Sequence, residues 1–293
     1  MLEVMNTNGN AVRVRGLRKR YRKTGAVEGV DFDIVDGEVF ALLGPNGAGK
    51  TTTVEILEGH RRRDAGKVSV LGEDPQRAGL GWRSQIGIVL QSSTDAAELT
   101  VAEMIRHFAR YYRRPRDPAS VIELVGLAEK AGSRVRHLSS GQRRRLDVAL
   151  GIIGRPRLLF LDEPTTGFDP AARQQFWALI RLLAAEGTTI LLTTHYLEEA
   201  EALAGRVAVL VGGRIVAAGA PATLAGRVRG SARVSWGEGA DRRVVETDRP
   251  AALVADLIGR HGGEVPALSV RRPTLEDTYL SLIADHQTGR HQP

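Results

Sequence analysis

The chain contains no cysteine and no long apolar run. Without cysteine, neither a disulfide bond nor a thiolate metal site can form. No segment approaches the roughly 18 consecutive apolar residues that a membrane-spanning helix needs. Residues 1–16 also lack the apolar core of a secretory signal peptide. We therefore expect a cytoplasmic protein without a membrane span of its own.

Aromatic residues are few, and the charge is only moderately one-sided. Aromatics make up 5 % of the 293 residues, and 41 basic residues against 34 acidic ones give a net charge of +7. Arginines and lysines cluster at 18–23, 61–63 and 143–145, which nucleic acid or an anionic membrane could exploit. Acidic residues are interspersed, however, and no long basic tract or array of aromatics appears. A solvated, arginine-rich surface explains the charge equally well.

The most informative stretch is GPNGAGKTT, which fits the pattern GxxxxGK[ST] and follows an apolar strand expected at 39–43. Its residues are Gly44, Pro45, Asn46, Gly47, Ala48, Gly49, Lys50, Thr51 and Thr52. The glycines allow a tight turn whose N–H groups point at phosphate oxygens, at the positive end of the next helix. Lys50 can reach the β- and γ-phosphates, and the Thr51 hydroxyl can join the coordination sphere of Mg²⁺. The loop predicts binding of a nucleoside triphosphate with Mg²⁺.

Strands and helices alternate along most of the chain. Strands are expected within 12–43 and at 67–71, 86–90, 158–161, 189–193 and 207–211, with a helix over 170–186. Residues 92–150 look helical and begin with a capping box, Thr100 to Glu103. This alternation predicts a mostly parallel sheet, which binds ligands beyond the carboxyl ends of its strands. Gly44, Asp162 and His195 all fall at such ends.

From about residue 225 the pattern changes. Strands are expected at 232–236, 243–246 and 267–270, and helices at 251–260 and 274–284. We interpret 226–285 as a small α+β domain. The polar tail, 286–293, is expected to be disordered.

Three further strand ends carry candidate catalytic groups. The run LLFLDE ends in Asp162 and Glu163, so burial of the strand places both carboxylates at its exposed tip. Asp162 suits Mg²⁺, and Glu163 can accept a proton from the attacking water or orient it. His195 follows the strand 190–194 and can act as a sensor of the γ-phosphate. Gln91 follows 86–90 and offers an amide oxygen to Mg²⁺ or water. A histidine or glutamine at such a position is more often an ordinary surface residue.

A second anion site is predicted at LSSGQ, about twenty residues before the Asp-Glu pair. Ser139 supplies a hydroxyl, Gly141 permits close approach of the backbone, and the helix that begins here directs its positive end outward. Taken alone, this string would be no more than a helix N-cap.

Together these motifs, in this order and spacing, identify residues 12–225 as a member of the ATP-binding cassette family. The resemblance implies that GPNGAGKTT is the Walker A loop, LLFLDE the Walker B strand, Gln91 the Q-loop glutamine and His195 the switch histidine. It also implies that Ser139, Ser140, Gly141 and Gln142 belong to the signature, that Asp169 is the D-loop aspartate, and that Tyr21 stacks on adenine. Ser140 and Phe168 depart from the glycine and leucine that the family usually has there. Because Gly141 and Glu163 are retained, we expect a hydrolytically competent site.

The family resemblance also implies a fold. It is a P-loop NTPase domain with a mostly parallel core sheet, an antiparallel β subdomain and a helical subdomain at about 92–150. The small C-terminal α+β domain would follow, and residues 1–11 would be a flexible N-terminus.

In this family the signature of one subunit closes over the ATP of another, so one copy of each motif implies a homodimer. The chain would need a separately encoded permease, docking near Gln91 and residues 92–150, and would lie peripherally on the inner face of the cell membrane. Residues 272–283 resemble the closing segment of daunorubicin-resistance exporter ATPases, which favours export of drugs, antibiotics or lipids. The alternative is a non-transport cassette ATPase acting on nucleic acid or ribosomes, but such relatives usually carry two cassettes, coiled coils or zinc cysteines. A phosphate-loop kinase or GTPase and an importer ATPase are weaker alternatives.

Overall fold

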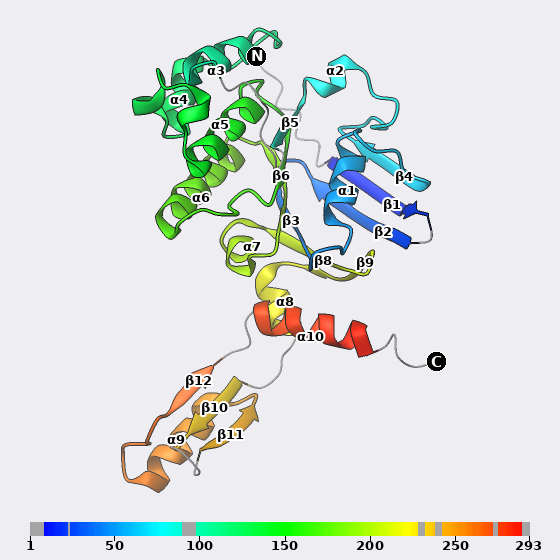
Figure 1. Ribbon diagram of the computed structural model, residues 1–293. Coiled ribbons are helices and arrows are strands. Elements are labelled where there is room, and N and C mark those ends of the chain that lie inside the picture. The colour runs from blue at the N-terminus through cyan, green and yellow to red at the C-terminus, as the bar shows by residue number, and fades with distance from the viewer. Residues whose placement is uncertain are drawn as a thin grey trace, which may run out of the picture. The chain divides into compact units, whose positions relative to one another are not determined.

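The computed structural model of the chain describes residues 9–22, 24–89, 98–227, 232–237, 242–271 and 275–288. The chain divides into two compact units, residues 1–216 and 217–293. Figure 1 shows their helices and strands. Within the described ranges, no helix combines the length and the apolar character that a bilayer crossing requires.

The first unit is built on a six-stranded sheet with the order β5-β6-β7-β3-β8-β9. Neighbouring strands from β5 to β8 pair in parallel, which confirms the expected sheet type. Every residue of β3, β6 and β7 is buried, as expected for strands covered on both faces. The strands are β3 (Val39–Leu43), β5 (Ile86–Val89), β6 (Leu158–Asp162), β7 (Thr189–Thr194), β8 (Arg206–Val211) and β9 (Arg214–Gly219).

An antiparallel sheet with the order β2-β1-β4 packs against this core. Its strands are β1 (Asn10–Tyr21), β2 (Thr24–Val35) and β4 (Ala65–Val70). The two sheets share one hydrophobic cluster, in which the rings of Phe32 and Phe40 stack with centroids 5.4 Å apart. Helix α1 (Lys50–Leu57) contributes Val54 and Ile56 to that cluster, and the short helix α2 (Leu80–Arg83) contributes Trp82. This packing fixes the position of α1 relative to β3, and so of the loop 44–49 that joins them.

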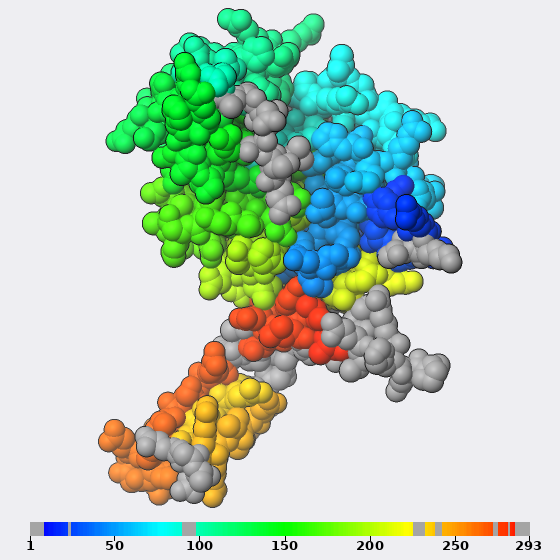
Figure 2. All heavy atoms as spheres, viewed as in Figure 1, coloured from blue at the N-terminus to red at the C-terminus, as the bar shows by residue number. Residues whose placement is uncertain are grey.

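The helical segment follows β5. It consists of α3 (Val101–Ala109), α4 (Pro118–Leu124), the 3₁₀ turns η1 (Ala128–Lys130) and η2 (Val135–His137), and α5 (Ser140–Ile152). Reciprocal bonds between Thr100 and Glu103 confirm the expected capping box. The segment (green) and the antiparallel sheet with α1 (blue to cyan) occupy different sides of the first unit (Figure 2). Two more helices, α6 (Pro170–Ala185) and α7 (Leu197–Leu203), complete the unit.

The second unit contains a three-stranded antiparallel sheet with the order β11-β10-β12. Helix α9 packs on this sheet through a small core of Val234, Leu257 and Val265. Helices α8 and α10 also contact each other, and the hydroxyl of Thr278 donates to the carbonyl of Leu224 at 3.5 Å. The elements are α8 (Pro221–Arg227), β10 (Ala232–Trp236), β11 (Arg243–Thr247), α9 (Pro250–His261), β12 (Ser269–Arg271) and α10 (Leu275–Thr288).

Three boundaries in the second half differ from the sequence expectation. The two compact units divide after residue 216, within β9, whereas the sequence analysis placed the domain boundary after residue 225, within α8. The last strand begins at Ser269 rather than at Ala267, whose φ of 47° breaks the extended backbone. Helix α10 continues to Thr288, three residues into the tail that was expected to be disordered.

Candidate functional site

The phosphate loop lies where it was predicted, between β3 and α1. Gly47 and Gly49 have φ values of 77° and 104°, which favour glycine. A Cβ atom on Gly44 would lie 2.3 Å from the carbonyl oxygen of Leu210, and one on Gly49 only 2.2 Å from that of Ala26. The loop therefore passes so close to neighbouring backbone that these positions require glycine.

Lys50 lies at the centre of this loop and is buried. Its ammonium donates to the carbonyl oxygens of Gly44 at 2.7 Å and Pro45 at 3.3 Å. Burial lowers the pKa of Lys50, and the nearby carboxylates of Glu163 and Asp162 oppose this effect. A buried cation surrounded by loop N–H groups is a site for phosphate oxygens.

Asp162 and Thr51 meet, as the magnesium prediction requires. The Thr51 hydroxyl donates to Oδ2 of Asp162 at 3.3 Å, and the Thr193 hydroxyl donates to Oδ1. Asp162 is buried at the end of β6, while Thr51, in the first turn of α1, is exposed. A carboxylate and a hydroxyl side by side are oxygen ligands of the kind that Mg²⁺ prefers, so these two residues fit a magnesium ion.

Glu163 lies between the ammonium of Lys50 and the imidazole of His195. Its Oε1 is 3.7 Å from Nζ of Lys50, and its Oε2 is 3.3 Å from Nδ1 of His195. The structure thus brings together the two predicted catalytic residues Glu163 and His195 beside the phosphate loop. Gln91, the third predicted catalytic residue, lies outside the described residues.

Tyr21 lines the same cavity as the phosphate loop. The cavity measures about 540 Å³ and extends from Tyr21 over the loop to Glu163. The cations of Arg61 and Lys19 lie 5.3 Å and 5.6 Å from the centroid of the Tyr21 ring. Neither cation is among the described residues that line the cavity. The ring is 39 % exposed, and such a face suits stacking of a base.

The signature residues lie elsewhere on the first unit, at the start of α5. Ser139 and Gln142 form a capping box in which each side chain bonds the backbone N–H of the other. Ser139 and Ser140 are exposed, and none of residues 139–142 is among the described residues lining the loop cavity. Asp169 is also exposed, and it caps α6 by accepting from the N–H of Ala172 at 2.8 Å. Within one chain these residues do not meet the phosphate loop.

Two residues that the sequence analysis did not single out contact the site. Thr193 bonds Asp162, and Arg144 on α5 donates to the carbonyl oxygens of Asp162 and Pro164. The only sequence signal for Thr193 is a polar pair, Thr193 and Thr194, at the end of an apolar strand. Arg144 stands within a run of three arginines that was interpreted as solvated surface, yet its side chain is buried.

Residues 27–166 match a protein-family model described as ABC transporter. The chain is 38 % identical over 304 residues to daunorubicin resistance ATP-binding protein DrrA3 of Streptomyces coeruleorubidus, covering 94 % of this chain and 96 % of the relative. It is also 38 % identical over 301 residues to Nod factor export ATP-binding protein I of Rhizobium sp. (strain N33), with coverage of 96 % and 97 %.

Solved structures show the same fold. An ATP-binding subunit of an ABC transporter superposes with a TM-score of 0.69 at 24 % identity, covering 93 % of this chain and 99 % of that one. An ATP-binding cassette solved as a dimer in a post-hydrolysis state with ADP and Pi gives a TM-score of 0.65 at 22 % identity, with coverage of 71 % and 98 %. The chain therefore belongs to the ATP-binding proteins of ABC transporters, and it is an ATPase of that family.

Proposed function

We propose that the chain binds ATP at the phosphate loop, hydrolyses it with Glu163, and thereby drives export through a separately encoded permease. One observation carries the catalytic part of this proposal. The carboxylate of Glu163 lies between Lys50 and His195, directly after Asp162, which bonds Thr51. A carboxylate at this place can orient the attacking water and accept its proton.

The other residues of the site bind and orient the nucleotide. The loop N–H groups and the Lys50 ammonium hold the β- and γ-phosphates, and Tyr21 stacks on the adenine. Thr51 and Asp162, with Gln91, would hold Mg²⁺, which when bound would neutralise phosphate charge. His195 donates from its imidazole to the γ-phosphate and holds Glu163 from the opposite side.

The ATP site is completed by a second copy of the chain. Residues 139–142 and Asp169 do not line the cavity of their own phosphate loop, and Ser139, Ser140 and Asp169 are exposed. The positive end of α5 is therefore available to the γ-phosphate of ATP held by another subunit. One of the solved cassettes with this fold is itself a dimer. ATP closes this dimer, and loss of the γ-phosphate reopens it.

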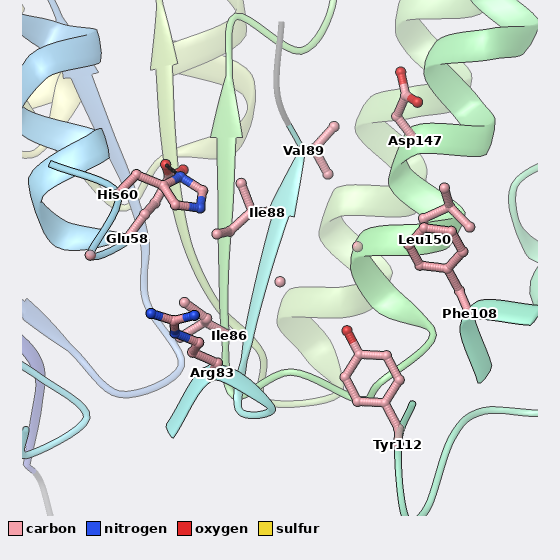
Figure 3. A pocket seen from close by; sticks show the side chains of 13 residues that line it. Glu58, His60, Arg83, Ile86, Ile88, Val89, Phe108, Tyr112, Asp147 and Leu150 are labelled. Carbon is pink, nitrogen blue, oxygen red and sulfur yellow. Dashed lines mark hydrogen bonds and ion pairs between the residues drawn. The ribbon is translucent and has the colours of Figure 1, made fainter. Parts of the chain in front are cut away.

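A groove between β5 and the helical segment is the proposed docking site of the permease. It has a volume of about 290 Å³. In Figure 3, Ile88 and Val89 extend from opposite sides of β5, and Phe108 and Tyr112 lie on the side of Val89. Glu58 and His60 lie on the other side of the strand. Oε2 of Glu58 is 3.2 Å from Nδ1 of His60. The groove combines apolar side chains with the ionisable groups of Glu58, His60, Arg83 and Asp147. A mixed lining of this kind suits a protein segment, so we place a cytoplasmic segment of the permease here. The chain would thus lie peripherally at the inner face of the cell membrane.

The direction and class of transport follow from the relatives. DrrA3 is a daunorubicin resistance protein and the Rhizobium relative is a Nod factor export protein, as their names state. Both are matched over nearly their whole length, including the second unit. We therefore propose export of drugs, antibiotics or lipids rather than import.

Substitution of Glu163 by glutamine tests the catalytic assignment. Glu163→Gln keeps the size of the side chain but removes its basic oxygen. ATP affinity should stay within about twofold of the wild type, hydrolysis should fall about 100-fold or more, and an ATP-bound dimer should accumulate. Size-exclusion chromatography with and without ATP and a phosphate-release assay measure these effects. Wild-type turnover would remove Glu163 as the catalytic carboxylate.

The permease assignment needs a separate test with a separate control. We expect Phe108→Ala to reduce copurification with the proposed permease, and to leave the ATPase rate of the isolated chain unchanged. Tyr111→Ala is the matched control, because Tyr111 lies near Phe108, is 69 % exposed and does not line the groove. Equal recovery of the permease with both variants would contradict docking at this groove. Stimulation of hydrolysis by candidate drugs in the copurified complex then tests the substrate class.

A further inference from the structure

Arg144 reaches from the signature helix to the backbone on both sides of Glu163. Its Nη2 donates to the carbonyl oxygen of Asp162 at 2.6 Å, and its Nε donates to that of Pro164 at 3.1 Å. The two acceptors are the residues directly before and after Glu163. Arg144 is buried, so these bonds are shielded from water and from salt.

Glu163 has a backbone conformation that needs such support. Its φ is 45°, in the left-handed region that a non-glycine residue rarely adopts because it is strained. Its N–H donates to the carbonyl oxygen and to the hydroxyl of Thr193, both at 3.1 Å. This conformation turns the carboxylate toward Lys50 and His195. Arg144 and Thr193 therefore both hold the backbone at this residue.

The guanidinium group is suited to this task. Its N–H groups form a rigid planar fork, so Nε and Nη2 can each reach one of two carbonyls separated by a single residue. The carboxyl groups of Asp147, Asp162 and Glu199 face its positive charge. A lysine ammonium would be a compact point charge on a flexible stem, without this fixed geometry.

Helix α5 also touches the loop after Glu163 at a second point. A Cβ atom placed on Gly141 would lie 4.0 Å from Cε1 of Phe168, whose ring packs edge-on against Phe176 with centroids 5.8 Å apart. The first two turns of α5 thus contact Asp162, the last residue of β6, and Pro164 after it, and they pass close to Phe168.

We infer that Arg144 is a positioning residue for the catalytic carboxylate. It acts through the backbone on either side of Glu163. The direction in which that carboxylate points therefore depends on the position of α5. The inference rests on the proposed catalytic role of Glu163. Because α5 begins at Ser139 and Ser140, a shift of the signature toward ATP would be transmitted to Glu163 of the same chain through one side chain.

The test replaces Arg144 by lysine, which keeps the charge and removes the fork. We expect kcat to fall about 10- to 100-fold, as for a reacting group misplaced by about 1 Å, with the Kd for ATP changed less than about twofold. Arg145→Lys is the matched control on the same helix, since Arg145 donates to the side chain of Gln175 and not to the loop around Glu163. It should retain the wild-type kcat. An unchanged kcat in Arg144→Lys, or an equal loss in Arg145→Lys, would overturn the inference.

A double-mutant cycle separates positioning from a general structural role. If Arg144 acts through the carboxylate, adding Arg144→Lys to Glu163→Gln should lower the residual single-turnover rate no further. The same fold-loss in both backgrounds would show that Arg144 acts independently of Glu163 and would end the inference. If Glu163→Gln itself turns over like the wild type, the proposed function fails instead. Should Arg144→Lys not fold, as judged by thermal unfolding, Arg144→Gln replaces it in the same cycle.

Discussion

The imidazole Nδ1 of His195 lies 3.3 Å from Oε2 of Glu163, and this contact joins the tips of two neighbouring strands. β6 ends at Asp162 and β7 at Thr194, so each residue directly follows its strand. Parallel pairing of these strands places both ends at the same edge of the sheet. Lys50 approaches the other carboxylate oxygen at 3.7 Å, which completes a row of three ionisable groups at the phosphate loop.

Removal of the imidazole tests the catalytic role of this contact. We expect His195→Ala to lower kcat about 10- to 100-fold, because Glu163 loses the group that orients it and the γ-phosphate loses a donor. The Kd for ATP should change little. His107→Ala, on α3 in the helical segment, is the control and should retain the wild-type rate. Steady-state phosphate release measures both, and wild-type kcat in His195→Ala would exclude this role.

Lys50 is predicted to contribute to ATP binding itself. Lys50→Ala should weaken ATP binding about tenfold or more, since a charge-assisted hydrogen bond to phosphate is lost inside a buried loop. Isothermal titration calorimetry with ATP gives the affinity. Lys67→Ala serves as the control because Lys67 is an exposed residue of β4. Unchanged affinity in the Lys50 variant would contradict the assignment of the phosphate loop.

Tyr21 is predicted to contribute through its ring and not through its hydroxyl. Tyr21→Ala should weaken ATP binding by about 1–3 kcal/mol, the usual range for base stacking, which corresponds to a factor of about 5 to 150. Tyr21→Phe and Tyr21→Trp should retain affinity. Competition between ATP and a fluorescent ATP analogue compares the three variants. Equal affinity of Tyr21→Ala and Tyr21→Phe would exclude stacking.

A pH-dependent stability is predicted from Glu58, which lines the groove and is 5 % exposed. Burial raises the pKa of Glu58 from 4.5 to about 8, and the charges of Asp162 and Glu55 add to the shift. The folded state therefore favours the protonated carboxyl, while the unfolded chain ionises near pH 4.5. The stability that this group contributes is fully present below pH 4.5 and is lost as the pH rises through about 8.

Glu58→Gln stays neutral and should escape this loss. Relative to the wild type, its melting temperature should increase steadily as the pH is raised from about 5 to about 8. Glu129→Gln changes an exposed glutamate in η1 and should show no such trend. Differential scanning calorimetry measures the melting temperatures of the three proteins across this pH range. A melting-temperature difference that does not vary with pH would mean that Glu58 is already ionised in the folded chain.

Local patterns predicted most of the elements and the residues of the phosphate loop. GPNGAGKTT places its glycines and Lys50 by covalent spacing alone, and the capping box at Thr100 and Glu103 depends on residues three apart. The helices α2, α7 and α8 and the strand β9 were not foreseen, because each is short and has no strong apolar pattern of its own. Their stability comes from packing, as for Trp82 in the shared core.

The amino-acid sequence alone determined which chemical groups are available for the site. It also determined that these groups follow parallel strands, whose carboxyl ends lie at one edge of the sheet. It also identified the family, because the motifs stand in a fixed order. Tertiary structure alone decided the left-handed backbone of Glu163, the bonds from Arg144 and Thr193 that hold it, and the separation of residues 139–142 from the loop cavity. These features depend on contacts between residues 18 to 30 positions apart, and side-chain direction across such distances is set by packing rather than by local pattern.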